Sequence, residues 1–268
     1  MANSKTPRRL TVTDFVKMKS KGEKITMLTA YDHSTATMLD EAGVDMLLVG
    51  DSLAMVVQGH ENTIPVSLDE MIYHGEMVAR AAKRAFVVVD IPFPVNHHGV
   101  HEAVKAAGRI MKETGCQAVK LEGGADQADV IQAMVNAGIP VIAHVGLRPQ
   151  AVHAMGGYKV QRDEEVLLND AIGAAEAGAF SVLLECIPGT IAKKITETLK
   201  VPTIGIGAGP DCDGQVLVIN DVLGLTSGYV PSFVKQYADL GKTITDAAKS
   251  WCTEVRSSEF PSEDQSFK

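Results

Sequence analysis

Charged and polar side chains follow several short apolar runs of this sequence, each after three or four hydrophobic residues. The positions are Asp51, Ser52, Asp90, Lys120, Glu122, His144 and Glu185. If the runs are parallel strands of one barrel, these side chains converge at one mouth. Four carboxylates taken out of water together repel one another, so a cation is their natural partner.

The donor types indicate which cation this is. Asp51, Asp90 and Glu122 offer only oxygen, which suits Mg²⁺ completed by water or substrate oxygens. Zinc prefers more nitrogen or sulfur, and His144 alone does not change that balance. We therefore expect Mg²⁺ at this mouth.

Each residue taken singly also has a structural explanation. An Asp at a strand end often caps a turn or the next helix. Lys120 and Glu122 are two residues apart, so they share one face of a strand and could form a plain ion pair. His144 could be a histidine satisfied within the core. The whole set is more specific than any one member.

The elements that position these residues alternate along the chain. Strand-like apolar runs cover 25–31, 45–51, 86–92, 118–124, 140–146, 181–188 and 202–208, and helical periods cover 67–82, 101–115, 127–138, 164–178 and 190–199. Near-continuous Val, Ile and Leu are typical of strands buried on both faces. Alternation of strand and helix predicts βαβ units and a parallel sheet, here a (β/α)₈ TIM barrel. The segment 67–82 also opens with a Ser and a Glu in a capping-box pattern.

The eighth strand is ambiguous in the sequence. Residues 215–221 have a strand composition, but they begin only a few residues after the seventh run. A parallel crossover usually needs a dozen residues or more. The spacing therefore favours a short helix over 213–224 and a last strand inside 229–237. Further helices are expected over 11–22, at the bottom of the barrel, and over 241–257, before a polar tail.

Composition places the chain among ordinary globular proteins. Its 268 residues are 46% hydrophobic and 22% charged, with a net charge of −8. These values exclude a disordered chain. A negative balance without basic runs argues against a nucleic-acid partner. No linker is visible, so we expect a single barrel domain over residues 1–268, with a short N-terminal helix and a C-terminal helix and tail.

Cysteine usage and the N-terminus suggest a cellular compartment. The chain has four cysteines, and none are at C-x-x-C spacing, so a thiolate zinc site is not expected. The first residues form no signal-peptide pattern. No stretch approaches the roughly 20 apolar residues that a membrane span needs. We expect a cytoplasmic protein without a membrane partner.

Three smaller features have simple interpretations. GIGAG (205–209) lacks the Lys-Ser/Thr of a phosphate loop, so a tight turn with close backbone packing is favoured. GGYKVQ (156–161) lies in a long connection, which suggests a functional loop or lid. Cys186 follows Glu185, so it should face the opposite side of the strand as a small core residue.

Nine motifs in order along the chain resemble the 3-methyl-2-oxobutanoate hydroxymethyltransferase (ketopantoate hydroxymethyltransferase) family. They are MLTAYD (27–32), LLVGDS (47–52), VVQGH (56–60), DIPF (90–93), VKLEGG (119–124), AHVGLRPQ (143–150), GGYKVQ (156–161), LLECIP (183–188) and IGIGAG (204–209). One such motif is weak evidence, but nine at ordinary spacing are specific. Arg162 and His33 depart from the family pattern and affect only loop details.

The resemblance implies a fold, a reaction and an assembly. It implies a (β/α)₈ barrel of the phosphoenolpyruvate/pyruvate type that forms a homo-oligomer, often a decamer. It implies transfer of a hydroxymethyl group from 5,10-methylenetetrahydrofolate to 3-methyl-2-oxobutanoate through a Mg²⁺-stabilised enolate. The implied product is 2-dehydropantoate, and the implied reaction is the first committed step of pantothenate biosynthesis.

The resemblance also assigns roles to residues. The family's metal-binding carboxylates fall on Asp51, Asp90 and Glu122. Its keto-acid contacts fall on Asp51, Ser52, Asp90 and Lys120, and its proton acceptor falls on Glu185. The chemistry agrees, because taking a proton α to a ketone needs a base and a stabilised enolate.

Other functions remain open at this point. A lyase of the same barrel type would use Mg²⁺ and an enolate without folate. A Schiff-base aldolase would use Lys120, and borohydride trapping would reveal it. A barrel that only binds a small acid, or serves as an assembly subunit, is expected to lack the strand-end carboxylates, and all of them are present.

Overall fold

The structure is a computed structural model that describes residues 8–267. The chain divides into two compact units, one ending at Val218 and the other beginning at Ile219, and each is described by itself. The first unit contains the barrel. The expectation of a single domain over residues 1–268 stays a prediction.

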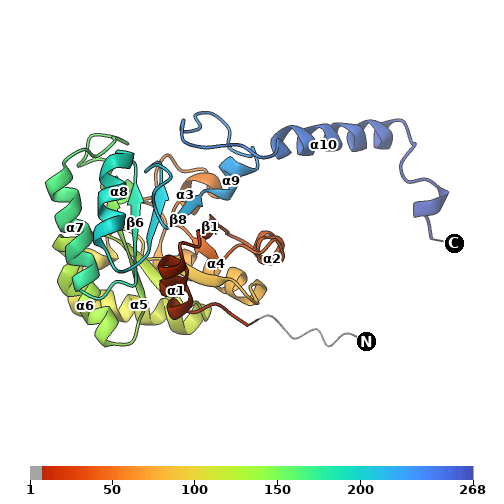
Figure 1. The fold of residues 1–268 in the computed structure, drawn as a ribbon. Helices are drawn as coiled ribbons and strands as arrows, with labels where there is room; N and C mark the ends of the chain where they lie inside the picture. Colours follow the sequence, from red (N-terminus) through yellow and green to blue (C-terminus); the bar gives the residue numbers. More distant parts are fainter. Residues whose placement is uncertain (1–7, 268) are drawn as a thin grey trace. The chain divides into compact units, whose positions relative to one another are not determined.

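Eight parallel strands form a closed barrel in the order of the chain (Figure 1). Their bounds are β1 Ile25–Thr29, β2 Met46–Val49, β3 Phe86–Asp90, β4 Ala118–Glu122, β5 Val141–Gly146, β6 Ser181–Glu185, β7 Thr203–Ile206 and β8 Gly214–Leu217. The first seven lie within the predicted runs, and every residue of β2 to β5 is buried. The predicted (β/α)₈ barrel is confirmed.

Helices surround the strands and connect most of them (Figure 1). Their bounds are α1 Val12–Lys21, α2 His33–Glu41, α3 Leu53–Val56, α4 Leu68–Ala81, α5 Val100–Thr114, α6 Ala128–Asn136, α7 Glu164–Glu176 and α8 Gly189–Thr198. The predicted capping box is present at α4, where Ser67 and Glu70 each bond the other's backbone N–H. Helix α2 was not among the predicted helical segments.

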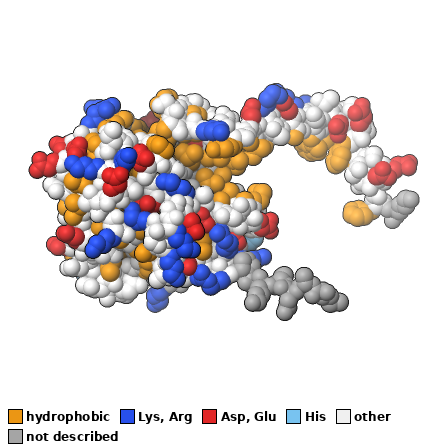
Figure 2. All heavy atoms as spheres, viewed as in Figure 1, with side chains coloured by type: hydrophobic (Ala, Val, Ile, Leu, Met, Phe, Trp, Pro, Cys, Tyr) orange, Lys and Arg blue, Asp and Glu red, His pale blue; other side chains and the backbone are white. Residues whose placement is uncertain are grey.

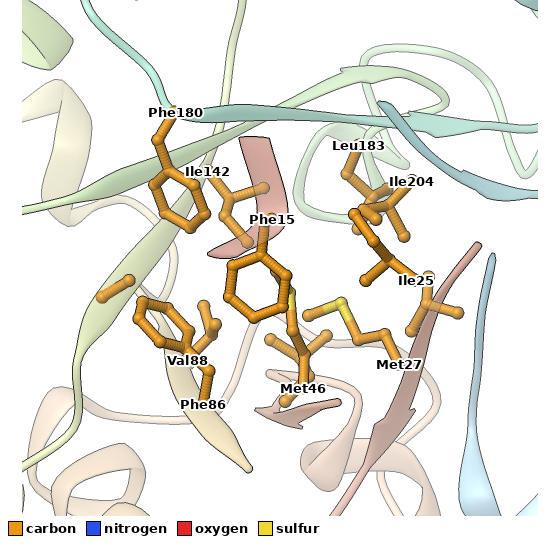
Figure 3. Close-up of a cluster of buried hydrophobic side chains, with 13 residues drawn as sticks. Phe15, Ile25, Met27, Met46, Phe86, Val88, Ile142, Phe180, Leu183 and Ile204 are labelled. Carbon is orange, nitrogen blue, oxygen red and sulfur yellow. The ribbon is translucent and has the colours of Figure 1, made fainter. Parts of the chain in front are cut away.

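An apolar cluster fills the barrel at the N-terminal ends of the strands (Figure 3). Phe15 of α1 is fully buried and meets Phe86 edge to face, with ring centroids 5.2 Å apart. Phe86 in turn meets Phe180 at 5.7 Å. Such aromatic pairs add to the stabilisation from buried area. The expectation that an N-terminal helix closes the bottom of the barrel is confirmed.

The expected position of the eighth strand is wrong. Strand β8 is Gly214–Leu217, within the segment expected to be helical, and residues 229–237 form no strand. The link over 207–213 is short because β7 has only four residues and rises about 13 Å. Seven residues reach up to about 25 Å, so no crossover helix is needed. Asp213 secures the link by accepting from Lys19 Nζ at 2.6 Å and from Thr203 N at 2.8 Å.

The second unit carries α9 (Ile219–Val222) and α10 (Leu240–Arg256). Helix α10 agrees with the helix predicted over 241–257, and its N-cap residue is Asp239, whose side chain accepts from Lys242 N. It has no buried residue, and Ile244, Trp251 and Val255 are 58%, 55% and 42% exposed. Apolar side chains lie along one side of this helix in Figure 2.

Candidate active site

The barrel brings the predicted site residues together at the C-terminal ends of its strands. Asp51 lies two residues after the end of β2, and Asp90 and Glu185 are the last residues of β3 and β6. Strand pairing places Asp90 beside Lys120 and Glu122 beside His144. All of these except Glu185 are at least nine-tenths buried, so charges lie where a core usually has apolar groups.

Asp90 links β2, β3 and β4. Its Oδ2 accepts from Asp51 N at 3.0 Å, and its Oδ1 lies 3.0 Å from Lys120 Nζ. A Cβ at Gly50 would lie 2.8 Å from Ser52 Oγ, so the glycine leaves room for that hydroxyl, whereas its distance of 3.7 Å from Asp90 Oδ2 would be an ordinary contact. Lys120 therefore pairs with Asp90, not with Glu122 as the simplest alternative supposed.

The charges of this group shift one another's pKa. Burial raises the pKa of Asp90 to about 7, against the pull of Lys120. Burial alone would lower the pKa of Lys120, but nearby carboxylates raise it above its usual value. Lys120 therefore remains an ammonium ion at neutral pH, and it opposes only part of the negative charge around it.

Gln150 holds two of the carboxylates, a role that the sequence did not reveal. Its Nε2 donates to Asp51 Oδ2 at 2.7 Å and to Ile91 O at 3.0 Å. Its backbone N–H donates to Glu122 Oε2 at 3.0 Å. The available signal was only its position, four residues beyond the end of β5 and next to Pro149. Gln150 fixes the orientation of both carboxylates.

Glu122 is a buried carboxyl with a raised pKa and one oxygen that has no partner. Burial, and then the charge of Asp51, raise its pKa well above the usual value. Within residues 8–267, its Oε1 is buried and accepts no hydrogen bond. A buried acceptor without a partner is unfavourable until a donor or a cation arrives.

The carboxylates expected to bind metal (Asp51, Asp90 and Glu122) are called here the metal-type carboxylates. His144 lies between them and Glu185. Its Nδ1 is 3.3 Å from Lys120 Nζ and its Nε2 is 3.2 Å from Glu185 Oε2. Burial and then the charge of Lys120 lower the pKa of His144 well below its usual value. Burial raises the pKa of Glu185 to about 7, against the pull of Lys120. His144 is therefore part of the charged group and not an isolated core histidine.

Ser52 and Tyr31 form the β1 and β2 side of the mouth. Ser52 Oγ and Tyr31 Oη are 2.9 Å apart. Burial raises the pKa of Tyr31 above its usual range, so the phenol keeps its proton at neutral pH. Ser52 is the N-cap residue of α3, but its side chain accepts no capping hydrogen bond, which leaves its hydroxyl for Tyr31 and for a ligand.

The segment predicted to be a loop or lid lies near the charged group. Tyr158 Oη is 3.8 Å from Met55 Sδ, and Gln161 N donates to Cys186 O. Burial, and then the charges of Asp51, Glu185 and Glu122, raise the pKa of Tyr158. The negative charge of the site carboxylates therefore acts on the Tyr158 hydroxyl.

Two smaller expectations are resolved by the backbone. Cys186 is only half-buried and has φ 48°, so it is not the fully packed core residue that was expected. A positive φ at a residue other than glycine indicates local strain beside Glu185. The tight turn expected over 205–209 is confirmed, since a Cβ on Gly209 would lie 3.0 Å from Gly189 Cα.

The oxygen donors fit Mg²⁺ shared with a ligand. Across the described part of the chain, no three His, Cys, Asp or Glu side chains form a ready-made metal cluster. Mg²⁺ commonly takes one or two carboxylates and completes its shell with water and substrate oxygens. Asp51 and Asp90 provide such a pair. Glu122 Oε1 is buried without a hydrogen-bond partner among the described residues, so it is available to contact the cation. The three-carboxylate set stays a prediction.

Solved structures with the same architecture define the class of barrel. A phosphoenolpyruvate phosphomutase from Streptomyces platensis subsp. rosaceus has a TM-score of 0.63 at 15% identity and covers 93% of this chain, which spans 88% of it. A 2,3-dimethylmalate lyase, described as a member of the PEP mutase/isocitrate lyase superfamily, has a TM-score of 0.60 at 17% identity, with 96% and 91% covered. At such identities the likeness concerns the fold alone. The chain shares the (β/α)₈ barrel fold of these structures.

Sequence comparison identifies the family. The ketopantoate hydroxymethyltransferase family matches residues 9–263. A relative from Rhodopirellula baltica, named 3-methyl-2-oxobutanoate hydroxymethyltransferase, is 58% identical over 266 residues, which are 99% of each chain. A relative of the same name from Desulforapulum autotrophicum is 55% identical, with 97% and 99% covered. The chain belongs to the ketopantoate hydroxymethyltransferase family, as its motifs suggested.

Proposed function

We propose that this protein transfers a hydroxymethyl group from 5,10-methylenetetrahydrofolate to 3-methyl-2-oxobutanoate, giving 2-dehydropantoate for pantothenate biosynthesis. The observation that carries the proposal is a buried oxygen-donor group beside a separate carboxyl, Glu185, whose pKa is raised to about 7. A binding-only barrel has no use for such an arrangement, because it destabilises the fold.

The keto acid is held by the β2 to β4 side of the mouth. Lys120 offers a fixed positive charge to the substrate carboxylate or to the oxyanion that develops at the 2-oxo group. Ser52 Oγ, which lies 2.9 Å from Tyr31 Oη, offers a hydrogen bond to the substrate. Because Lys120 is held by Asp90 at 3.0 Å, its position is set before substrate arrives.

Asp51, Asp90 and Glu122 would hold Mg²⁺ together with the substrate oxygens. When bound, this ion polarises the 2-oxo group as a Lewis acid. Gln150 contributes by orienting Asp51 and Glu122 through its side-chain and backbone N–H groups. One similar solved structure, of a phosphonopyruvate hydrolase, is described as a complex with oxalate and Mg²⁺, and its likeness of 13% identity concerns the fold.

Glu185 is the general base. It takes the proton from C3 of the keto acid, and the C–H electron pair becomes the enolate. A base with a pKa near the working pH combines a usable ionised fraction with proton affinity, and burial raises the pKa of Glu185 to about 7. Water adds to the methylene carbon of the folate, and both of its carbon–nitrogen bonds break, so that tetrahydrofolate leaves and the carbon is released at the level of formaldehyde. The enolate carbon bonds to this carbon, and the oxygen that came from water takes a proton and becomes the hydroxyl group.

The first half of this reaction can be tested without folate. We would incubate the protein with Mg²⁺ and 3-methyl-2-oxobutanoate in D₂O and follow the C3 proton by NMR. We expect exchange that requires Mg²⁺ and falls by about 100-fold or more in Glu185→Gln. The exposed Glu197→Gln serves as a matched control with unchanged exchange.

The outcomes separate the alternatives. Exchange followed by product formation only with methylenetetrahydrofolate supports the transferase, whereas carbon–carbon bond chemistry without folate supports a lyase. No exchange under either condition removes this substrate. Near-normal exchange in Glu185→Gln removes Glu185 as the base.

We also infer a homo-oligomer, and the family resemblance favours a decamer. The support is the exposed apolar side of α10, where Ile244 and Trp251 are more than half exposed. A double change of Ile244 and Trp251 to Ser should reduce the mass measured by light scattering.

No helix in the described part of the chain has the length and apolar character to cross a membrane. The cytoplasmic location predicted from the sequence stays a prediction.

A further inference from the structure

One line of buried contacts runs from the metal-type carboxylates to Glu185. Asp90 Oδ1 is 3.0 Å from Lys120 Nζ, which is 3.3 Å from His144 Nδ1, and His144 Nε2 is 3.2 Å from Glu185 Oε2. The His144 side chain is 3% exposed. Glu122 Oε1 lies farther from Nδ1, at 3.8 Å, and makes no hydrogen bond with it. The ring therefore has one near neighbour on each nitrogen and little access to water.

The neighbour on Nδ1 decides which nitrogen carries the proton. A lysine ammonium can only donate, so Nδ1 facing Lys120 acts as the acceptor. A second proton on the ring would place an N–H against that ammonium. The neutral ring then carries its proton on Nε2.

The Nε2–H group points toward the proposed base. Nε2 makes no aligned hydrogen bond within the described residues, although it is buried. Glu185 Oε2, at 3.2 Å, comes into line after a small rotation of either side chain. Catalytic hydrogen bonds are often loose before substrate binds and tighten afterwards.

We propose that His144 is a positioning residue for Glu185, with its Nε2–H tautomer fixed by Lys120 and donated to Oε2 of the base. This inference rests on the proposed function. The donation leaves Oε1 of Glu185 to take the proton from C3 of the keto acid. It also makes the orientation of the base depend on the same lysine that meets the substrate.

Other charged groups around Glu185 do not supply this hydrogen bond. Lys120 acts on it by charge, and Glu122 repels it from β4. Tyr158 and Cys186 lie on the loop side, and the pKa of each is raised first by burial and then by nearby carboxylates that include Glu185. His144 is the one among these neighbours that has an N–H group at 3.2 Å from the carboxylate.

Two variants of His144 separate its two nitrogens. The amide nitrogen of Gln lies about where Nε2 lies, whereas the amide of Asn reaches only about as far as Nδ1. His144→Gln therefore keeps a donor toward Glu185, and His144→Asn keeps only the contact with Lys120. Exchange of the C3 proton in D₂O, with Mg²⁺ and without folate, is measured against pH and keto-acid concentration.

We expect His144→Asn to lower the maximal exchange rate by about 10- to 100-fold, as for a lost hydrogen bond to a charged group. The midpoint of its pH profile should move upward, because an anion without its donor binds a proton more readily. The KM for the keto acid should change less than threefold, and His144→Gln should keep most of the rate.

The contrary results separate failure of the positioning role of His144 from failure of the proposed function. If wild-type protein exchanges but both variants fall equally with an unchanged pH midpoint, the positioning role is overturned and the proposed function stands. A loss confined to KM or to thermal stability has the same meaning. If wild-type protein does not exchange the C3 proton, the proposed function fails and this inference fails with it.

Discussion

The two ends of the barrel interior are equally buried but are filled with opposite chemistry. At the N-terminal ends of the strands, Phe15 and Phe86 pack with 0% and 2% exposure. At the C-terminal ends, Asp90 and Lys120 are buried to 2% and 4%. Apolar burial stabilises a fold, whereas buried charge is unfavourable unless it is paired. The difference shows which end holds the barrel together and which end is reserved for a ligand.

The largest expected effect comes from a substitution in the apolar cluster at the N-terminal ends of the strands. Phe15→Ala should lower the free energy of unfolding by about 3–5 kcal/mol, because it leaves a cavity among strand side chains. Denaturant unfolding measures the change. Val16→Ala, at a neighbouring position that is 42% exposed, should change it by less than about 0.5 kcal/mol.

The activity of Phe15→Ala sharpens the same point. The folded variant should keep a rate of C3 proton exchange within about twofold of wild type, since the two ends share no hydrogen bond or ion pair among the contacts described. A large loss of exchange in protein that is shown to be folded would mean that the ends are mechanically coupled.

The second test reduces charge at the other end. Glu122→Gln should raise the Mg²⁺ concentration for half-maximal exchange by about 10- to 100-fold, as for the loss of a metal-associated carboxylate. Without Mg²⁺, its free energy of unfolding should be unchanged or higher, because one buried carboxyl that is repelled by Asp51 has been removed. Asp129→Asn, on an exposed carboxylate, is the control. An unchanged Mg²⁺ requirement would exclude Glu122 from the metal site.

The third test uses pH and Glu185. The folded-state pKa of Glu185 is about 7, above the value near 4.3 of an unfolded chain. Between these values the folded state binds more protons, so the stability contribution of Glu185 falls as pH rises. Glu185→Gln cannot ionise and should gain about 3 kcal/mol of stability over wild type from pH 4.5 to pH 7.5.

The measurement is a difference between two proteins, so other titrating groups cancel. Denaturant unfolding of wild type and Glu185→Gln is compared at each pH, without Mg²⁺. The same comparison with Glu197→Gln, on an exposed residue, should show no trend. A constant difference between wild type and Glu185→Gln would show that Glu185 is ionised in the folded protein throughout.

Much of this architecture was predictable because local patterns and the global fold agree. Seven strands follow from continuous apolar runs, and the placement of Asp90 and Glu185 follows from strand ends. The eighth strand was missed because the spacing rule assumes that a helix connects two parallel strands. Strands β7 and β8 have only four residues each, so the short link over 207–213 connects them without a helix. A one-strand error at the end of the barrel did not disturb the site, which β2 to β6 build.

The contacts inside the site could not be predicted from spacing. Gln150 reaches Asp51 from a position 99 residues away, and no periodic pattern reports such a contact. The orientation of His144 between Lys120 and Glu185 depends on the register of β4 against β5 and on rotamers. Sequence spacing indicates which residues share a mouth, but three-dimensional packing decides which atoms meet.

The smallest expected effect concerns helix caps, which stabilise the ligand-binding end without occupying its centre. Ser67 precedes α4, and Ser67 and Glu70 satisfy each other's backbone N–H groups. Ser67→Ala should lower the free energy of unfolding by about 1 kcal/mol and leave C3 proton exchange unchanged, while Ser67→Asn should retain most of the stability because Asn caps equally well. Thermal unfolding of the two variants measures this difference. If Ser67→Ala instead impairs exchange at unchanged stability, the helix caps belong to the catalytic machinery, and the division between stabilising and ligand-binding parts of this end is wrong.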